Sequence, residues 1–537
     1  MKYIGIDLGT TYSCISVFDE KTNEPLTLDI MSNRKTMPSV VYYGGSTPIV
    51  GYAAKKHIFS ESEKTVSLAK TYLGTDKIWK INGQNYTPVD VSADILKALV
   101  DVYYNEFGNE DYKCIVTCPA NYRQDKKGLI SDAANKAGLN ILGFLNEPTA
   151  AAISYFNDNL DVINKTIIVF DLGGGTLDVT VATCTEGSNG IPEYVVRTSK
   201  GIERLGGSNW DLVIQKELIK QCSEQSGCSE ENIKQNRQDM NKIKFESEDF
   251  KKQLSDGDLE DSFTLSLTGE LIDFELTQED FENKTSDLLN EALNIFDIAL
   301  KSSFEDNSSG LRPVTIDSIQ NVILVGGASR MPQIKKGLIK KYPAFKDKIL
   351  IRDPDYSISK GACIWCKKTA NLEPDKVPLK ERLSSSYGEN MLVLKEHLIK
   401  NIDEYEYNQY YKLYDACSNI VYLGETIPCK KIETSCTADE SQDSVYIAIY
   451  KNNFGKDSPY GKYIPLSKCS LCSGFYINLP AGLPKNTIIE TTINIDAAGL
   501  MKVTSVCSGR QGTCEIKIHN ECILTPGGEV DKILGIE

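Results

Sequence analysis

The sequence has very little histidine and no long apolar run. Three histidines occur among 537 residues, which leaves few imidazole ligands for a metal site. No stretch of about 18 or more uncharged apolar residues is present, so a membrane-spanning helix is not expected. The N-terminus lacks the basic start and apolar stretch of a secretory signal. We therefore expect a cytoplasmic protein without a membrane partner.

The sequence also has fewer basic than acidic residues. Lys and Arg number 59 against 74 Asp and Glu, which gives a net charge of −15. This balance disfavours broad attraction to nucleic acid or to anionic membranes. Hydrophobic residues at 41% and charged residues at 25% are typical of a globular protein. At this length the chain is expected to form two or more domains.

The cysteines do not suggest a disulfide scaffold. Sixteen of them are scattered along a long chain, unlike the dense cysteine frameworks of small secreted domains. Two pairs, Cys363/Cys366 and Cys469/Cys472, have the C-x-x-C spacing. A zinc site would require these pairs to meet or to recruit histidine. We interpret the cysteines as reduced thiols and keep the zinc site as an alternative.

The chain changes character along its length. Residues 1–370 alternate strand and helix patterns, which indicates an α/β domain. Residues 371–383 carry two prolines and mixed charge and are predicted to form a linker. Short strand-like runs separated by turn residues predict an all-β domain over 384–525, and 526–537 remain as a short tail.

Three local patterns predict individual elements. Residues 2–18 read as a hairpin, two apolar runs around a Gly-Thr-Thr turn. Residues 91–107 and 278–300 have apolar positions at helical spacing. The second of these helices begins after Thr277, a candidate N-cap with Asp280 three residues on.

One pattern occurs twice, about 160 residues apart. Residues 4–11 and 168–176 each form an apolar strand that ends in Asp, at Asp7 and Asp171, followed by a turn rich in Gly and Thr. Glycine allows the backbone to approach a phosphate closely, and successive N–H groups form an anion site. A carboxylate beside it can hold Mg²⁺ through water. Either turn alone is common, but the pair predicts two pseudo-symmetric lobes that grip a triphosphate.

A third segment resembles a nucleotide-base site. Residues 321–332 read as a buried strand, a Gly-Gly turn and a helix start with Pro332 near its first turn. Such a turn allows a flat base to lie against the backbone. An ordinary strand–turn–helix corner is the alternative for this segment taken alone.

These segments together resemble the seventy-kilodalton heat-shock chaperones of the DnaK type, over nearly all of residues 1–366. The resemblance implies an actin-like ATPase domain of two pseudo-symmetric lobes, followed by a β-sandwich domain of the peptide-binding type. It also implies ATP or ADP as ligand, with Mg²⁺ and K⁺. The segments that carry it are 5–14, 146–152, 170–179, 205–207 and 324–330.

The resemblance assigns roles to individual residues. Lys70 takes the place of the family's catalytic lysine, whose positive charge would orient the attacking water. Lys252 stands where an arginine is usual, and lysine lacks the planar group that stacks on adenine. The implied catalytic residues are Asp7, Lys70, Glu147, Asp171 and Thr176, and the implied metal-shell residues are Asp7, Asp171 and Asp178. The implied nucleotide contacts are Gly9, Thr10, Thr11, Tyr12, Gly173, Gly174, Gly175, Gly206, Gly207, Glu248, Lys251, Lys252, Ser255, Gly326, Gly327, Ser329, Arg330 and Asp355.

The C-terminal half is less similar to the family. Residues 425–428 and 493–503 resemble parts of its β-sandwich. Ala438, Val445 and Ile447 then fall near the positions that contact an extended peptide. A β-domain kept only for packing is the alternative, because a shared fold does not establish a site.

Several features depart from the family. The linker has no leucine run, and only residues 520–537 follow the last strand-like run, too few for a helical lid. Gly143 and Lys127 replace arginines that meet J-domain partners in the family. We therefore do not expect ordinary J-domain control, while nucleotide-exchange factors remain compatible partners.

The leading hypothesis is an ATP-dependent molecular chaperone that acts on unfolded or extended peptides during protein folding and stress. The alternative is a nucleotide-binding co-chaperone, exchange factor or scaffold with little turnover. A small-molecule kinase and a filament-forming relative of actin share the architecture, but the 146–152 segment and the trailing β-domain count against both.

Overall fold

The computed structural model divides the chain into two compact units, Met1–Asn371 and Leu372–Glu521. We call the second unit the β-module. The structure describes residues 1–517 except 121, 123, 160, 188–191, 257–261, 305–310, 373–378, 383–385, 400, 401, 423, 424, 428, 453, 457 and 496–499. The predicted tail, 526–537, lies outside these residues. In the part of the chain that is described, no helix has the length and apolarity needed to cross a membrane.

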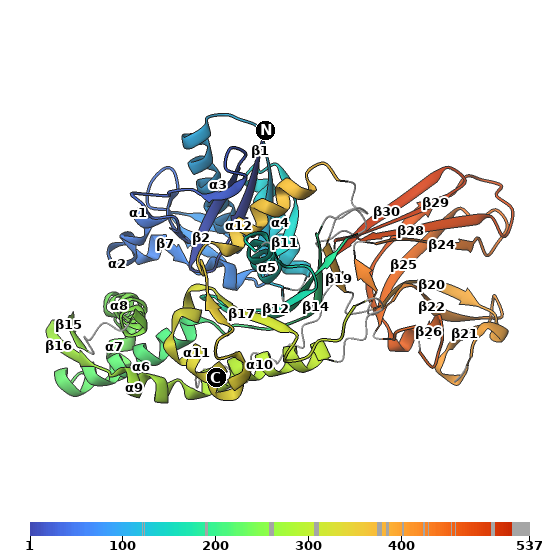
Figure 1. The fold of residues 1–537 in the computed structure, drawn as a ribbon. Coiled ribbons are helices and arrows are strands. Elements are labelled where there is room, and N and C mark those ends of the chain that lie inside the picture. The colour runs from blue at the N-terminus through green and yellow to red at the C-terminus, as the bar shows by residue number, and fades with distance from the viewer. Residues whose placement is uncertain are drawn as a thin grey trace. The chain divides into compact units, whose positions relative to one another are not determined.

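The first unit consists of two lobes whose central sheets have the same strand order (Figure 1). Lobe I contains, in spatial order, β11 (Ile141–Asn146), β10 (Tyr112–Cys118), β1 (Lys2–Asp7), β2 (Tyr12–Asp19) and β3 (Glu24–Thr27), with β4 (Met37–Pro38) beside β2. Lobe II contains β18 (Ile349–Ile351), β17 (Ile319–Val325), β12 (Lys165–Leu172), β13 (Thr176–Glu186) and β14 (Pro192–Glu203).

The repeated motif occupies equivalent positions in the two sheets. In lobe I, β1 pairs antiparallel with β2 and parallel with β10. In lobe II, β12 pairs antiparallel with β13 and parallel with β17. The predicted hairpin over 2–18 is therefore confirmed, and so is the repeat. Strands buried on both faces explain the nearly continuous apolar runs in both copies.

Each lobe has its own hydrophobic core, and two helices cross close together beside the sheets. The cores are centred on the buried faces of β1 and β12. Helix α5 (Glu147–Asn157) packs against α12 (Ser357–Thr369). A Cβ atom at Gly361 would lie 1.8 Å from the Ala150 carbonyl oxygen. This crossing therefore requires glycine.

The predicted helices are found, with one difference. The prediction over 91–107 corresponds to α3 (Pro88–Phe107). The prediction of a single helix over 278–300 was wrong, because the segment forms α9 (Gln278–Lys284) and α10 (Ser286–Phe304). Thr285 separates them: its hydroxyl lies within hydrogen-bond distance of the Phe281 carbonyl and of the buried Gln333 side chain. This local bonding competes with regular helix geometry.

The remaining elements of the first unit surround the two sheets. Helices α1 and α2 project from lobe I and α8 from lobe II on the same side (Figure 1). The helices are α1 (Tyr52–Lys55), α2 (His57–Ser60), α4 (Gln124–Lys136), α6 (Gly207–Ser226), α7 (Glu230–Gln235), α8 (Arg237–Asp256) and α11 (Pro332–Lys341). The small strands are β5 (Val40–Tyr42), β6 (Ile49–Val50), β7 (Thr65–Ser67), β8 (Trp79–Ile81), β9 (Gln84–Tyr86), β15 (Ser262–Leu267) and β16 (Glu270–Glu275).

The β-module contains two sheets that share an apolar core. The predicted all-β character is confirmed by these two sheets. One sheet contains β21 (Glu406–Asn408), β22 (Leu413–Val421), β20 (Ser386–Val393), β25 (Ser444–Asn452) and β27 (Ser470–Asn478), with β26 (Tyr463–Pro465) beside β22. The other contains β24 (Cys429–Cys436), β28 (Ile488–Ile495), β29 (Leu500–Cys507) and β30 (Arg510–Lys517).

The segment predicted as a linker contains a strand. Within 371–383, β19 (Leu379–Arg382) pairs with β23 (Thr426–Ile427) of the β-module. Residues 373–378 and 383, which include both prolines of the prediction, lie outside the described part of the chain.

Candidate functional site

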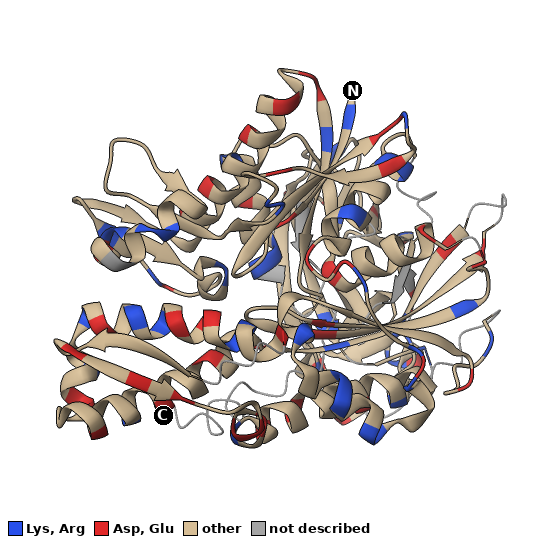
Figure 2. Cartoon of the chain, turned by 60° about the vertical axis from the view of Figure 1, so that its left-hand side comes forward, with Lys and Arg blue, Asp and Glu red and all other residues tan. Residues whose placement is uncertain are grey.

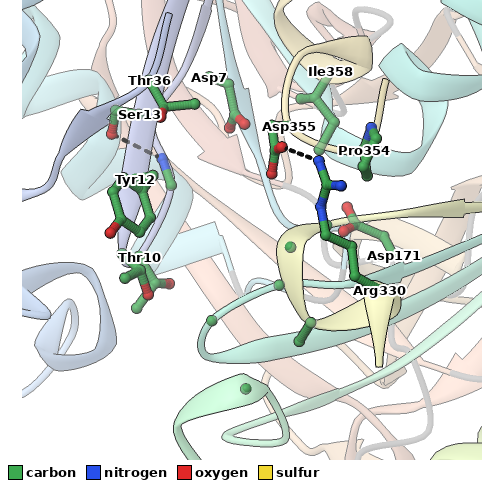
Figure 3. Close-up of a pocket in the computed structure, with 18 of the residues that line it drawn as sticks. Asp7, Thr10, Tyr12, Ser13, Thr36, Asp171, Arg330, Pro354, Asp355 and Ile358 are labelled. Carbon is green, nitrogen blue, oxygen red and sulfur yellow. Dashed lines mark hydrogen bonds and ion pairs between the residues drawn. The ribbon is translucent and has the colours of Figure 1, made fainter. Parts of the chain in front are cut away.

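A cavity of about 420 Å³ lies in the first unit between the two hairpin turns, and Figure 3 shows Asp7 and Asp171 reaching it from different lobes. Its size is typical of a small-ligand site. The predicted residues that line it are Asp7, Gly9, Thr10, Thr11, Tyr12, Lys70, Glu147, Asp171, Gly173, Gly174, Thr176, Gly207, Glu248, Lys251, Lys252, Ser255, Gly326, Gly327, Arg330 and Asp355.

The two glycine turns approach each other closely. A Cβ atom at Gly174 would lie 2.0 Å from the Thr11 hydroxyl oxygen, although the two residues belong to different lobes. A Cβ atom at Gly206 would lie 2.4 Å from the backbone nitrogen of Gly175. A side chain at Gly174 would displace the Thr11 side chain, and one at Gly206 would displace the backbone of the second turn, so glycine allows the close approach at both positions. The cavity is therefore bordered by backbone from both lobes, as the repeat predicts.

Lys70 and Glu147 form a buried ion pair at the cavity. Lys70 lies on the short helix Ala69–Tyr72, and Glu147 is the first residue of α5. The Lys70 amino nitrogen lies 2.7 Å from a Glu147 carboxylate oxygen, and both side chains are almost fully buried. The ring of Tyr122 lies 5.7 Å from the same nitrogen. A buried charge that is paired in this way has a fixed position.

Four carboxylates, those of Asp7, Glu147, Asp171 and Asp178, are grouped around Asp171, and Lys70 is the cation that opposes their charge there. Asp7 ends β1, and Asp171 lies opposite Asp178 in the β12–β13 ladder. Burial, together with the charge of Glu147, raises the pKa of Asp7 to about 7, although Lys70 and a hydrogen bond from Thr117 oppose the shift. Burial and the neighbouring carboxylates raise the pKa of Asp171 well above its usual range. The site therefore carries an excess of negative charge that a cation would relieve.

The arrangement fits a hydrated Mg²⁺ ion better than a directly ligated one. Carboxylate oxygens are the ligands that Mg²⁺ prefers, and Mg²⁺ keeps several of its waters in proteins. Among the described residues, no three His, Cys, Asp or Glu side chains converge closely enough to hold a metal ion themselves. Asp7, Asp171 and Asp178 therefore suit an ion held through its water shell. A site for K⁺ beside the Mg²⁺ site stays a prediction.

The opposite end of the cavity is formed by the third predicted segment. Gly326 has a φ of +79°, and a Cβ atom there would lie 2.4 Å from the Leu172 carbonyl oxygen. The buried Ser329 hydroxyl donates to the Val325 carbonyl at 2.6 Å and holds the turn. Arg330 pairs with Asp355 beside this turn (Figure 3). This end of the cavity thus offers exposed backbone and one planar guanidinium.

Side chains from both lobes meet at the cavity entrance. Tyr12 of β2 donates a hydrogen bond to Glu248 of α8 at 3.3 Å. The Lys252 and Lys55 amino groups lie 2.6 and 3.5 Å from the same carboxylate. Burial alone would raise the pKa of Glu248, but the two lysines outweigh it and lower that pKa to about 2. The carboxylate therefore stays ionised and joins the lobes.

Two more predicted contacts on α8 and α6 are linked to each other. The Lys251 amino group lies 2.6 Å from Asp211 and donates to the Gly207 carbonyl at 2.9 Å. The Ser255 hydroxyl donates to the Lys251 carbonyl. Lys251 is thus held at the start of α6, next to the second glycine turn.

The family comparison agrees with this geometry. The family model described as Hsp70 protein matches residues 3–392. The chain belongs to the Hsp70 family. Its two units accordingly correspond to an actin-like ATPase domain and a β-rich C-terminal domain.

Curated relatives of this Hsp70 family member include two named chaperones. One is the "Chaperone protein DnaK" of Ureaplasma urealyticum serovar 10, and the other is the protein of the same name from Ureaplasma parvum serovar 3. Each is 29% identical over 549 residues, which covers 99% of this chain and 80% of the relative.

Four predicted residues of the Hsp70 site do not line the cavity but support it. Gly175 is part of the second turn and Gly206 packs against it, Asp178 lies beside Asp171 in the sheet, and Ser329 holds the third turn. Other lining residues were not predicted from the sequence. These are Ser13, Cys14, Thr36, Tyr52, Asp256, Ala328, Met331, Pro354 and Ile358. Several adjoin predicted positions, but Thr36 and Tyr52 lie in segments without a repeated motif.

The two positions that depart from the family's J-domain contacts differ in environment. Lys127 of α4 points inward, is 9% exposed, and donates to the Asn146 side chain at 2.8 Å. Asn146 directly precedes Glu147 of the cavity. Gly143 lies on β11 opposite Ile115.

Figure 2 shows basic and acidic residues interspersed over the helices and strands.

The three predicted peptide contacts lie in one part of the β-module. Ala438 lies in the loop between β24 and β25, where its N–H donates to Gln442. Val445 and Ile447 lie on β25, and Ile447 is buried in the core between the two sheets. A peptide site at these residues stays a prediction.

Proposed function

We propose that this Hsp70 family member binds and hydrolyses ATP, and that the ATP cycle controls binding of extended peptide segments in the β-module. The observation that carries the proposal is the pair of glycine turns facing each other across the cavity, with the buried Lys70–Glu147 pair beside them. Backbone N–H groups from two lobes and one fixed positive charge are suited to a triphosphate.

The residues at the cavity would have different roles in phosphoryl transfer. Thr10 and Thr11 add hydroxyl donors to the first turn. Asp7 and Asp171 would hold Mg²⁺ through water, and the ion would neutralise phosphate charge when bound. Lys70 places a positive charge where negative charge develops, and Glu147 orients that lysine. Water is the acceptor, so the reaction gives ADP and phosphate.

Contacts between the two lobes at the cavity entrance would favour closure of the lobes around the nucleotide. Tyr12, Glu248, Lys252 and Lys55 connect lobe I to lobe II. A nucleotide that touches both lobes adds to these contacts and favours the closed arrangement. The nucleotide would act on the β-module by stabilising one arrangement of the two lobes over another.

Single-turnover ATP hydrolysis tests the site. Lys70→Ala and Asp7→Asn should each lower the rate by about a hundredfold or more, because each removes charge placed for the transition state. Lys97→Ala is the matched control, since Lys97 pairs with Asp101 on an exposed face of α3. Turnover at the unsubstituted rate in both cavity variants would refute the assignment.

One observation favours a second function, a nucleotide-binding co-chaperone or scaffold with little turnover. Lys127 is turned toward Asn146 rather than outward, which disfavours ordinary J-domain stimulation. Steady-state ATPase measured with and without a J-domain protein separates the two functions. Tight ATP binding with background hydrolysis in both conditions supports the scaffold.

A further inference from the structure

In the β-module, Cys469 of the second C-x-x-C pair contacts a cysteine that is distant in sequence. Cys417 lies on β22, and Cys469 follows the short helix Leu466–Lys468. The side chains of Cys417 and Cys469 are hydrogen-bonded to each other. Both belong to the same apolar cluster, whereas Cys472 packs against the core between the two sheets. The C-x-x-C spacing therefore does not identify the partner of Cys469.

The surroundings hold the two sulfurs in place. The Asn452 side-chain N–H lies 3.8 Å from the Cys417 sulfur, and the Cys417 thiol lies 3.7 Å from the Asn419 oxygen. The Cys469 sulfur lies 3.4 Å from the Pro465 carbonyl oxygen. Strand β26 pairs with β22 and brings these segments together. The contact thus depends on the pairing of β26 with β22 and on the short helix that follows β26.

The two thiols differ in accessibility and ionisation. Cys417 has no solvent exposure, whereas Cys469 is partly exposed. Hydrogen bonds from Cys417 and Asn452 lower the pKa of Cys469. For Cys417, the hydrogen bond with Cys469 and burial of the thiol raise the pKa. Since the thiolate is the reactive form, Cys469 is suited to react first and Cys417 to react second.

We propose that Cys469 and Cys417 are a site of reversible oxidation, at which a hydroperoxide converts the two thiols into a disulfide within the β-module. Nothing in the nucleotide cavity takes part. Among the described residues no group of three or more ligating side chains is placed to hold a metal ion, so oxidation explains the pair better than metal binding.

The chemistry requires one equivalent of hydroperoxide. The Cys469 thiolate attacks one peroxide oxygen, the O–O bond breaks, and the departing oxide takes a proton to leave as water or alcohol. The resulting sulfenic acid on Cys469 is then attacked by the Cys417 sulfur, which loses its proton as the S–OH bond breaks and a second water leaves. Two thiols lose two electrons in total, and the peroxide gains them.

The disulfide would connect β22 to the chain just before β27. It would close a loop that includes β25 and β26 and restrict the unfolded β-module more than the folded one. We expect oxidation to raise the thermal midpoint of the β-module by several degrees, and reduction with a dithiol to reverse the shift.

The test uses the full chain, fully reduced and then exposed to a slight excess of hydrogen peroxide. Peptide mapping by mass spectrometry without reduction should find a Cys417–Cys469 cross-link as the main disulfide. Cys469→Ser should abolish the cross-link, and Cys472→Ser, in the same C-x-x-C pair, should keep it. Cys436, which is exposed, reports non-selective oxidation.

Three outcomes would overturn the proposal. One is a Cys469–Cys472 disulfide as the main product. Another is oxidation of Cys469 to the sulfonic acid with no cross-link, and the third is cross-linking only between chains. Mapping of the unsubstituted protein decides among them even if a serine variant fails to fold.

Discussion

At the scale of single residues, Glu389 places a carboxyl group wholly inside the β-module. It lies on β20, has no solvent exposure, and accepts a hydrogen bond from Thr491 at 2.7 Å. Burial raises the pKa of Glu389 to about 7, and the charge of Glu433 adds to the shift.

This shift predicts how stability depends on pH. Because the folded pKa is raised, the contribution of Glu389 to stability is fully present below the unfolded pKa of about 4.5 and is lost as pH rises toward about 7. Glu389→Gln should therefore stabilise the β-module by about 3 kcal/mol at about pH 8 relative to its effect at about pH 4. Urea unfolding at both pH values measures the difference.

The control for this prediction is Glu490→Gln, which changes an exposed carboxyl on β28. Its stability should follow the unsubstituted protein at every pH. A Glu389→Gln variant with the same pH dependence as the unsubstituted protein would contradict the raised pKa.

Gly206 gives a second prediction at this scale. An alanine Cβ would meet the Gly175 backbone nitrogen at 2.4 Å, so the second glycine turn must shift. We expect Gly206→Ala to weaken ATP binding about tenfold or more in calorimetry with magnesium. Gly45→Ala is the matched control, because the nearest atom to its Cβ is at 3.7 Å. Equal affinity in both variants would show that the turn does not border the ligand.

At the scale of elements, the start of α9 depends on one side chain. The Thr277 hydroxyl accepts from the Asp280 N–H at 3.1 Å and caps the helix, as the sequence predicts. Thr277→Ala should lower the free energy of unfolding by about 1 kcal/mol, and Thr277→Ser should keep most of it. Urea unfolding followed by tryptophan fluorescence measures both. A loss in the serine variant as large as in the alanine variant would argue against the cap.

At the scale of the whole molecule, the first unit contains both lobe cores and every residue of the cavity. We therefore expect the fragment 1–371 to fold alone and to bind Mg·ATP with the affinity of the full chain. All three tryptophans, Trp79, Trp210 and Trp365, lie in it, so their fluorescence reports its folding. Calorimetry on fragment and full chain checks the affinity, and a folded fragment without ATP binding would contradict the prediction.

Hydrolysis rates in the same two samples address coupling between the units. Equal single-turnover rates would indicate that the β-module does not influence the ATP cycle. A rate that changes with the β-module present, and changes again with an extended peptide, supports the chaperone function.

Much of this protein was determined by the sequence alone. The two Asp-Gly-Thr hairpins, the third glycine turn and the Thr277 cap could be predicted because each depends on neighbours within a few residues. Glycine positions and apolar runs carry that local information directly. The repeat extended the prediction to two lobes, since equal motifs form equal strand pairs.

Only the tertiary structure decided which distant side chains meet. Thr36 and Tyr52 line the cavity, Lys127 turns toward Asn146, and Cys469 contacts Cys417 instead of following its C-x-x-C spacing. Thr285 interrupts a predicted helix through a bond to Gln333. Each of these contacts depends on packing between elements far apart in the chain, and no local pattern of residue types encodes that packing.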